Sequence, residues 1–336
     1  MKVIEIQNTF GLDSLTLTER PDPSPGYGQV LLKMRAVSLN YRDLMVVKGL
    51  YNPKFHLPLI PTSDGVGEVV AVGEGARRVK IGDRVAGIFF QKWQSGLRTE
   101  ENVKSDLGGN IDGVLAEYVV LHEDGVVRIP EHLTDEEGAS LPCAAVTAWN
   151  ALIPSGNLKA GDTVLIQGTG GVSIFALQFA QLQGAKVIAT SSSDEKLERV
   201  RQLGAAAGIN YKQTPEWGNK VRELTGGIGV DYVVEVGGAG TLNQSLRAVR
   251  YGGQISLIGV LSGGSGEIAT ASILMKSVRI QGINVGSREM FEAMNKAIAL
   301  HKLRPVIDRV FRFQEAKAAL EYMQSGSHFG KICLRF

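Results

Sequence analysis

A glycine-rich turn between a strand-like run and a helix-like run is the segment best suited to chemistry. Val164–Ile166 is short, apolar and partly β-branched, which is typical of a buried strand in a parallel sheet. After the turn, apolar residues recur at helical spacing as far as Gln183. Unpaired N–H groups at the start of a helix bind anions, and glycines let a pyrophosphate approach the backbone. The residues expected at such a phosphate group are Gly168, Thr169, Gly170, Gly171 and Val172.

This glycine pattern is incomplete, because Ser173 stands where a third glycine is usual. An ordinary strand-to-helix turn is therefore the alternative to a dinucleotide-binding turn. The surrounding chain favours the dinucleotide, since it alternates strand-like and helix-like segments, as a doubly wound parallel sheet does. Strands are predicted at 163–167, 185–190, 207–211, 231–236, 254–260 and 278–282, and helices at 171–183, 193–203, 216–225, 241–250 and 287–300.

The ends of two of these helices carry local signals. Gly184 and Gly204 stand where a helix would stop in the left-handed conformation. The segment Ser192–Glu195 has the spacing of a capping box, which predicts that Ser192 caps the following helix.

The first part of the chain has a different pattern. Its short apolar runs are separated by glycine and proline turns, which predicts an antiparallel β-barrel or sandwich. Residues 91–113 are polar and are expected to form an exposed loop. Residues 301–336 are too few to fold alone and are expected to pack back on the first domain. The predicted boundaries are a first domain at 1–124, completed by 301–336, and a nucleotide-binding domain at 125–300.

Length and composition exclude several classes of protein. A chain of 336 residues favours two domains, and 44% hydrophobic residues can bury a sizeable core. A net charge of +2 without a basic stripe argues against nucleic-acid binding. No apolar stretch is long enough to cross a membrane, and the strand-like start is unlike a signal peptide. Two cysteines exclude a disulfide framework, so we expect a cytoplasmic protein that acts on a small molecule.

With these features placed, the whole chain resembles the medium-chain dehydrogenase/reductase superfamily, and most of all its zinc-independent quinone oxidoreductases and enone or enoyl reductases. The segments that carry the resemblance are Gly28–Lys33, Asn40–Asp43, Gly65–Gly73, Gly82–Val85, Leu141–Trp149 and Gly330–Ile332. The resemblance implies an α/β fold with a GroES-like β-barrel catalytic domain and a doubly wound Rossmann domain. It also implies a homodimer, for which we expect Arg279–Gly282 and the neighbouring residues 266–275 to form the contact.

The zinc-binding members of this superfamily hold a catalytic metal at three positions, and two of these positions have changed in this chain. Asn40 stands at the first position, and Thr62–Asp64 stands where a Gly-His-Glu motif is usual. Only Cys143 retains a ligand type, and one thiol cannot hold zinc, which needs three protein ligands. We therefore predict no metal and interpret Cys143 as a small core residue.

The end of the second predicted strand favours NADPH over NADH. NAD-binding folds often place an acidic residue there, but the chain has small hydroxyls and reaches no acid before Asp194. In NADPH-using relatives, a matching serine, lysine and tyrosine contact the 2′-phosphate; the residues here are Ser191, Ser192, Lys196 and Tyr211. Helix capping is the alternative role for the serines. The carboxyl ends of later strands add Gly237, Gly259 and Val260.

Three further residues owe their predicted roles to the resemblance. Thr147 matches a position beside the nicotinamide, or else is a helical threonine bonded to its own backbone. Tyr51 matches a proposed proton donor, and Asn40 is expected to help polarise a carbonyl group. Tyr41 or water is the alternative proton donor. Arg42 and Asp43 are expected to form a local ion pair.

The sequence therefore predicts an NADPH-dependent oxidoreductase that transfers hydride to a quinone, activated alkene or carbonyl group without a metal. One alternative is an alcohol or aldehyde dehydrogenase of the same superfamily. The other is a protein that binds NADPH without catalysis.

Overall fold

The computed structural model describes residues 1–336, and the chain divides into two compact units. The first unit is Met1–Val146 with Val285–Phe336, and the second unit is Thr147–Asn284. The division therefore lies later than the predicted 124/125 boundary and earlier than the predicted 300/301 boundary. The second difference arises because the helix α10 (Arg288–His301) is bonded to the first unit, where Asn295 Nδ2 donates to the Arg128 carbonyl at 3.0 Å.

The first unit is built on a mostly antiparallel sheet with the order β14-β15-β3-β4-β5-β7, and β6 pairs with β3. Its strands are β1 Lys2–Ile6, β2 Leu15–Glu19, β3 Gln29–Ser38, β4 Asp64–Val72, β5 Arg84–Gly87, β6 Tyr118–His122, β7 Val126–Arg128, β14 Ile307–Arg312 and β15 Lys331–Arg335. Its other helices are α1 Tyr41–Val47, α2 Glu100–Val103, α3 Asp135–Ala139, the π-helix Leu141–Ala145 and α11 Ala316–Gln324. The predicted antiparallel β structure is confirmed by these pairings.

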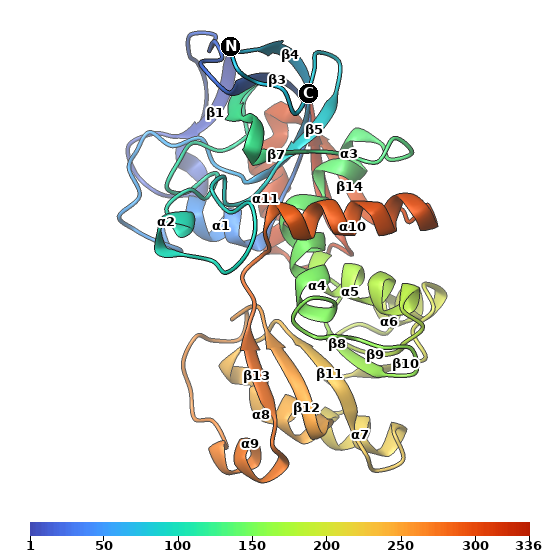
Figure 1. Cartoon of the computed structure of the whole chain (residues 1–336). Coiled ribbons are helices and arrows are strands. Elements are labelled where there is room, and N and C mark those ends of the chain that lie inside the picture. Colours follow the sequence, from blue (N-terminus) through green and yellow to red (C-terminus); the bar gives the residue numbers. More distant parts are fainter. The chain divides into compact units, whose positions relative to one another are not determined.

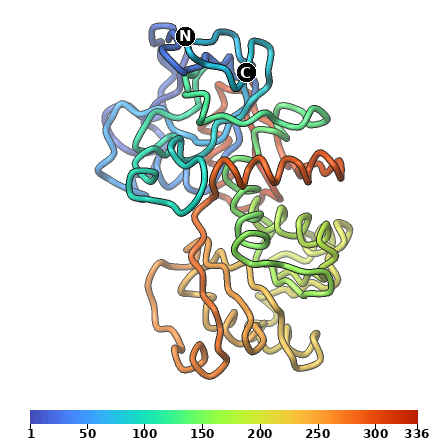
Figure 2. Tube along the Cα trace, in the orientation of Figure 1, coloured from blue at the N-terminus to red at the C-terminus, as the bar shows by residue number.

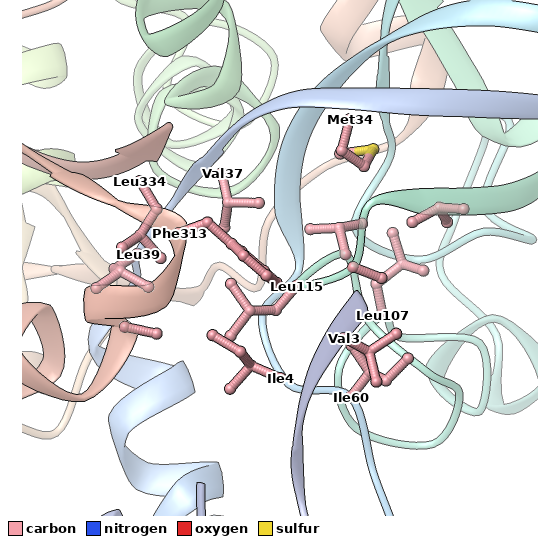
Figure 3. Packing of buried hydrophobic residues seen from close by; sticks show 14 of the residues in the cluster. Val3, Ile4, Met34, Val37, Leu39, Ile60, Leu107, Leu115, Phe313 and Leu334 are labelled. Carbon is pink, nitrogen blue, oxygen red and sulfur yellow. The ribbon is translucent and has the colours of Figure 1, made fainter. Parts of the chain in front are cut away.

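The C-terminal strand β15 belongs to this sheet, whereas β1 pairs with β2 in a separate two-stranded sheet of the first unit. β15 pairs antiparallel with β3, and Cys333 lies opposite Ser38. Figure 2 shows the red C-terminal segments among the blue N-terminal ones within the first unit. Figure 3 shows residues from distant parts of the chain together in the core, where Phe313 and Leu334 pack near Ile4 and Leu115. Ile332 and Leu334 of β15 are therefore part of the first unit's core.

The second unit is a six-stranded parallel sheet with the order β10-β9-β8-β11-β12-β13. Its strands are β8 Thr163–Gln167, β9 Lys186–Ser191, β10 Ala207–Asn210, β11 Val230–Glu235, β12 Val249–Leu257 and β13 Arg279–Gly282. Its helices are α5 Gly171–Leu182, α6 Asp194–Gln202, α7 Trp217–Leu224, α8 Ala239–Ala248 and α9 Thr270–Lys276, and α4 Val146–Leu152 begins at the unit boundary. This order confirms the predicted doubly wound sheet.

The direction of the strand order reverses between β8 and β11. Because crossovers between parallel strands are right-handed, this reversal places the helices of the two halves on opposite faces. Figure 1 shows α5 and α6 on one side of the sheet and α7 and α8 on the other. The chain therefore leaves a crevice-forming switch point at the carboxyl ends of β8 and β11, which is where such sheets bind ligands.

Most predicted segments of this unit match observed elements, with some shifts at the ends. Gly184 and Gly204 have φ values of +76° and +98°, as predicted for left-handed helix stops. The predicted cap of α6 was wrong by one residue, because Ser193 and not Ser192 accepts from the Lys196 N–H, at 3.3 Å. β12 begins at Val249, inside the segment predicted to be helical.

One segment of the first unit differs from expectation, and the predicted dimer contact at β13 stays untested. The segment 91–113 is not simply an exposed loop, because it contains α2 and its Leu107 is fully buried in the core of the first unit. None of the helices combines the length and the apolar character that a membrane span requires. β13 is an edge strand of its sheet, and its role in a homodimer stays a prediction.

Candidate functional site

The glycine turn after β8 leaves open space for a ligand. Gly168 has a φ of +69°, and a Cβ atom added at Gly168 or Gly170 would meet no atom within 4 Å. The Gly168 N–H donates to the Thr190 carbonyl at 2.7 Å, which joins the turn to the end of β9. No side chain caps the start of α5. The turn therefore offers free backbone donors and room for the phosphates of a dinucleotide.

Ser173 occupies the position of the missing third glycine without obstructing this turn. Its side chain is buried, and its Oγ donates to the Gln167 carbonyl at 2.6 Å. The hydroxyl is therefore turned back toward β8 and away from the open side of the turn. This contact explains how a strand-to-helix turn with an incomplete glycine pattern keeps its shape.

The residues expected at a 2′-phosphate lie together beyond β9. The Tyr211 N–H donates to the Ser191 carbonyl at 3.0 Å, which places β10's end beside β9's end. Ser191 is buried and its Oγ accepts from the Ser193 N–H, whereas Ser192 and Lys196 are half-buried and Tyr211 is 41% exposed. The three more exposed residues can therefore contact a phosphate group directly.

The first acidic residue after β9 is already engaged. Asp194 accepts from Asn210 Nδ2 and from Gln213 Nε2, each at 2.9 Å, so that both carboxylate oxygens have a partner. A carboxylate held in this way is less available to bind a ribose hydroxyl, which is the usual task of the acid in NAD-binding folds.

The remaining expected cofactor residues lie at the carboxyl ends of β11 and β12, except Thr147. A Cβ atom at Gly238 would meet the Val260 Cα at 2.8 Å, so the turns that hold Gly237, Gly259 and Val260 are in contact. The Ser262 N–H donates to the Gly237 carbonyl at 2.7 Å. Thr147 is buried in α4.

A buried hydrogen-bond network that the sequence analysis missed holds this edge of the sheet. Glu235, the last residue of β11, is fully buried, and its Oε1 accepts from the N–H groups of Gly237 and Gly238 at 2.8 and 3.0 Å. The same oxygen accepts from Thr241 Oγ1 at 2.6 Å. Its Oε2 accepts from Gln167 Nε2 at 2.7 Å, and Gln167 is the last residue of β8. Glu235 therefore ties the β11 turn to the strand that carries the glycine turn.

In the first unit, the three positions that hold a metal in zinc-binding relatives are brought together. Asn40 Nδ2 donates to Ser63 Oγ at 3.4 Å, Ser63 Oγ donates to Asp64 Oδ1 at 2.7 Å, and the Cys143 N–H donates to Asp64 Oδ2 at 2.9 Å. Of these side chains, the Cys143 thiol and the Asp64 carboxylate are of types that bind zinc, whereas an amide and a hydroxyl are not, so the cluster falls short of the three protein ligands that zinc needs. No group of three or more His, Cys, Asp and Glu side chains is placed to hold a metal ion.

Backbone strain lies next to this polar cluster. Thr62 has a φ of +71°, an unusual value for a β-branched residue, and its buried Oγ1 has no hydrogen-bond partner. A Cβ atom at Gly113 would lie 2.0 Å from the Thr62 carbonyl oxygen, so this approach requires glycine. Close packing around Thr62 therefore holds the strained backbone next to Ser63 in place, since an unfavourable backbone conformation persists only where surrounding contacts fix it.

Tyr51 lies beside an arginine that is itself held in place. The Arg42 guanidinium is 5.1 Å from the centre of the Tyr51 ring, and Arg42 also donates to Asp106 and to the Leu107 carbonyl. The expected pair of Arg42 with Asp43 exists at 3.6 Å, but Asp106 is the closer partner. Asp43 instead accepts from the Asn40 N–H at 2.8 Å. Arg42 therefore connects Asp106 and Leu107, in the buried part of the 91–113 segment, to Tyr51.

Burial shifts the pKa values of four groups in this cluster upward. Desolvation raises the pKa of Asp43 to about 6, although Arg42 opposes the shift, and raises the pKa of Asp64 against the pull of Lys331. Burial, and then the charge of Asp64, raise the pKa of the Cys143 thiol, which is only partly exposed and lies in this polar cluster, not in the apolar core that we expected. Desolvation also raises the pKa of Tyr51, which therefore stays protonated at neutral pH, as a proton donor must.

Comparison with known proteins agrees with this geometry. Residues 26–131 match the alcohol dehydrogenase GroES-like domain, and residues 171–299 match the zinc-binding dehydrogenase family. The chain is 46% identical to a zinc-type alcohol dehydrogenase-like protein of Schizosaccharomyces pombe over 97% of this chain and 96% of that protein. The chain belongs to the medium-chain dehydrogenase/reductase superfamily. It is also 32% identical to the quinone oxidoreductase of Sus scrofa, over 93% of this chain and 90% of that one.

Solved structures of this superfamily share the whole fold. An NAD-dependent alcohol dehydrogenase is similar with a TM-score of 0.92 and 33% identity, over 100% of both chains. A mycobacterial protein complexed with NADPH is similar with a TM-score of 0.83 and 27% identity, also over 100% of both chains. As a member of this superfamily of dehydrogenases and reductases, the chain is an NAD(P)-dependent oxidoreductase.

The residues that the sequence analysis missed had only weak signals. Lys331 is the first residue of β15 and Glu235 is the last residue of β11, so each is a charged residue next to apolar strand residues. Asp106 lies in the segment that was expected to be exposed. A charge inside an apolar run is the signal that could have pointed to Lys331 and Glu235.

We predict that Glu235→Gln destabilises the second unit and weakens NAD(P)H binding. Glutamine places an amide group against donors that now bond to a carboxylate, so the free energy of unfolding should fall by about 2–4 kcal/mol. Urea denaturation and cofactor titration measure the two effects. Glu198→Gln, an exposed change on α6, is the control. Equal stability of the two variants would contradict the role of Glu235.

We also predict a pH-dependent difference between the wild type and Asp43→Asn. The folded-state pKa of Asp43 is raised from 3.8 to about 6, so the folded state binds this proton more tightly than the unfolded state does. The resulting stabilisation, about 3 kcal/mol, is present below pH 4 and is lost as the pH rises through 6. Urea denaturation between pH 4 and 7 should show the wild type losing stability relative to Asp43→Asn. The exposed Asp13→Asn variant should not reproduce this difference.

Proposed function

We propose that this oxidoreductase uses NADPH to reduce a quinone or an activated alkene, such as an enone, without a metal ion. The observation that supports the proposal is the polar cluster of Asn40, Ser63, Asp64 and Cys143. It offers hydrogen-bond donors at the positions where zinc-binding relatives have metal ligands. Such donors stabilise charge on a substrate oxygen when they are fixed in place in a site that excludes water.

The proposed reaction needs two protein groups. NADPH, when bound, supplies hydride to the β-carbon of the alkene, and the electron pair of the C=C bond shifts toward the carbonyl oxygen. The Asn40 amide donates a hydrogen bond to that oxygen while it carries negative charge. Tyr51, whose raised pKa keeps it protonated, gives its proton to the α-carbon and is reprotonated from water. The substrate gains two electrons and two hydrogens in total.

The preference for NADPH rests on the groups beyond β9. Lys196 and the hydroxyls of Ser192 and Tyr211 suit a phosphate group, and both oxygens of Asp194 are occupied by amides. An acidic residue free to bind a ribose 2′-OH is therefore lacking at this place.

The second candidate is an alcohol or aldehyde dehydrogenase. It is favoured by the name of the Schizosaccharomyces pombe relative, a zinc-type alcohol dehydrogenase-like protein, and by the similar NAD-dependent alcohol dehydrogenase structure. The donor set of this chain argues against it, because only the Cys143 thiol and the Asp64 carboxylate at these positions are preferred zinc ligands, and zinc needs three protein ligands.

Substrate turnover tests the proposed function. We expect the purified protein to consume NADPH with an enone or a 1,2-quinone, and to do so equally after treatment with a metal chelator. Products identified by mass spectrometry should be saturated at the former C=C bond. Turnover of a saturated aldehyde alone, or loss of activity on chelation, would support the alcohol dehydrogenase instead.

The Tyr51→Phe variant tests the proton donor. We expect kcat for the enone to fall by about 10²–10⁴-fold, as the loss of a general acid does, with little change in KM. Tyr41→Phe tests the alternative donor, and Tyr27→Phe, at an exposed site elsewhere in the first unit, is the control. An unchanged kcat in Tyr51→Phe would remove Tyr51 from the chemistry.

The Lys196→Gln variant tests the cofactor preference. Loss of a charged contact to the 2′-phosphate should raise KM for NADPH by about 10–100-fold and leave KM for NADH unchanged. Arg201→Gln removes the same charge from an exposed position on the same helix and is the matched control. Equal effects of Lys196→Gln on both cofactors would contradict a phosphate contact.

A further inference from the structure

A buried lysine stands at one end of the polar cluster. Lys331 is the first residue of β15 and is only 3% exposed. Its Nζ donates to the Leu39 carbonyl and to Asn40 Oδ1, each at 2.7 Å. Both acceptors are neutral groups, and Asn40 is a residue of the proposed active site. Because the buried ammonium group donates to Asn40 Oδ1, it sets the orientation of the Asn40 side-chain amide.

The residues at the two ends of the cluster, Lys331 and Asp64, indicate which atom donates and which accepts in each hydrogen bond between them. An ammonium group only donates, so Asn40 must turn its Oδ1 toward Lys331 and its Nδ2 away from it. Asp64 accepts at both oxygens, from Ser63 Oγ and from the Cys143 N–H, and Ser63 Oγ in turn accepts from Asn40 Nδ2. The chain of bonds thus runs one way, from the ammonium group of Lys331 through Asn40 and Ser63 to the carboxyl group of Asp64. We name these four residues the polar chain.

This direction matters for catalysis because the two ends of an amide have opposite effects on a substrate oxygen. An Nδ2 group facing the substrate donates to a developing negative charge, whereas an Oδ1 group in the same place would repel it. The two orientations of an asparagine differ little in shape, so a neighbour has to select one. Lys331 also polarises the amide, since hydrogen bonds in a chain strengthen one another.

We propose that Lys331 is a positioning residue that holds the Asn40 amide with its N–H groups toward the substrate oxygen. The inference rests on the proposed function, in which Asn40 stabilises that oxygen. Lys331 does not touch the substrate in this proposal, and acts only through Asn40. β15 brings the lysine to its place, because the Leu39 N–H donates to the Ile332 carbonyl at 2.9 Å where β3 ends.

A double-mutant cycle with Lys331→Met and Asn40→Ala tests this proposal. Methionine keeps the length of the side chain and removes both the charge and the donors. We expect Lys331→Met to lower kcat for the enone by about 10–100-fold, somewhat less than the loss of a donor to the oxyanion itself. KM for NADPH should not change. In the Asn40→Ala background, Lys331→Met should have no further effect on kcat, because the residue through which it acts is gone.

Asn40→Asp separates the two roles of the amide. The carboxylate still accepts from Lys331 but cannot donate to the substrate, so kcat should fall while the urea denaturation midpoint stays near that of the wild type. Lys317→Met, an exposed change at the Asp13 ion pair, is the control and should leave both quantities unchanged. A kcat within twofold of the wild type in Asn40→Asp would overturn the proposal.

The outcomes are distinguishable from a failure of the proposed function. If the wild type reduces enones but the losses in kcat from Lys331→Met and Asn40→Ala multiply, Lys331 is only structural and this proposal is wrong. If the wild type reduces only an aldehyde, the proposed function is wrong, and the same cycle on the aldehyde tests Lys331. If Lys331→Met does not fold, Lys331→Gln replaces it. Its loss in kcat must then vanish in the Asn40→Ala background, and an equal loss in both backgrounds would overturn the proposal.

Discussion

An ionisable side chain that leaves water needs charged or hydrogen-bonding partners, and each unit of this chain buries at least one. In the second unit, Glu235 satisfies both carboxylate oxygens with donors from β8, the turn after β11 and α8. In the first unit, Lys331, Asp64 and Asp43 are buried within a few hydrogen bonds of one another. The cost of leaving any of them unpaired fixes the backbone around them. These hydrogen bonds therefore hold the backbone at both groups of proposed site residues.

The order of the parallel strands explains why the second network lies where it does. The reversal between β8 and β11 separates their connecting helices, so no helix covers the carboxyl ends of these two strands. The strand ends on the two sides of such a crevice have to be held in a fixed relative position. The bond from Gln167 to Glu235 does this, because it links the last residues of the two strands on either side of the reversal. The same carboxylate then fixes the Gly237–Gly238 turn above them.

Local sequence signals predicted the parts of this fold that depend on local physics. The glycine stops at Gly184 and Gly204 and the parallel strands of the second unit follow from backbone conformation and periodicity. The cap of α6 was misplaced by one residue, because Ser191, Ser192 and Ser193 all have suitable side chains and only the backbone geometry selects one. The roles of Lys331 and Asp106 could not be predicted from local sequence signals. Their partners Asn40 and Arg42 lie 291 and 64 residues away, and only the folded sheet brings them together.

The chemistry of the first unit's cluster bears on the direction of the reaction. Oxidation of an alcohol requires removal of its proton, and in zinc enzymes the metal makes that proton acidic. Tyr51 and Cys143 do not serve as that base, because burial raises their pKa values and so keeps both protonated. Reduction of a conjugated alkene needs no such base. It needs a hydrogen-bond donor to the carbonyl oxygen and a proton donor to the α-carbon. In the proposed reduction, the Asn40 amide is the donor to the oxygen and the Tyr51 phenol gives the proton. Lys331, in the same proposal, acts through its hydrogen bond to Asn40 Oδ1, which sets the orientation of the amide.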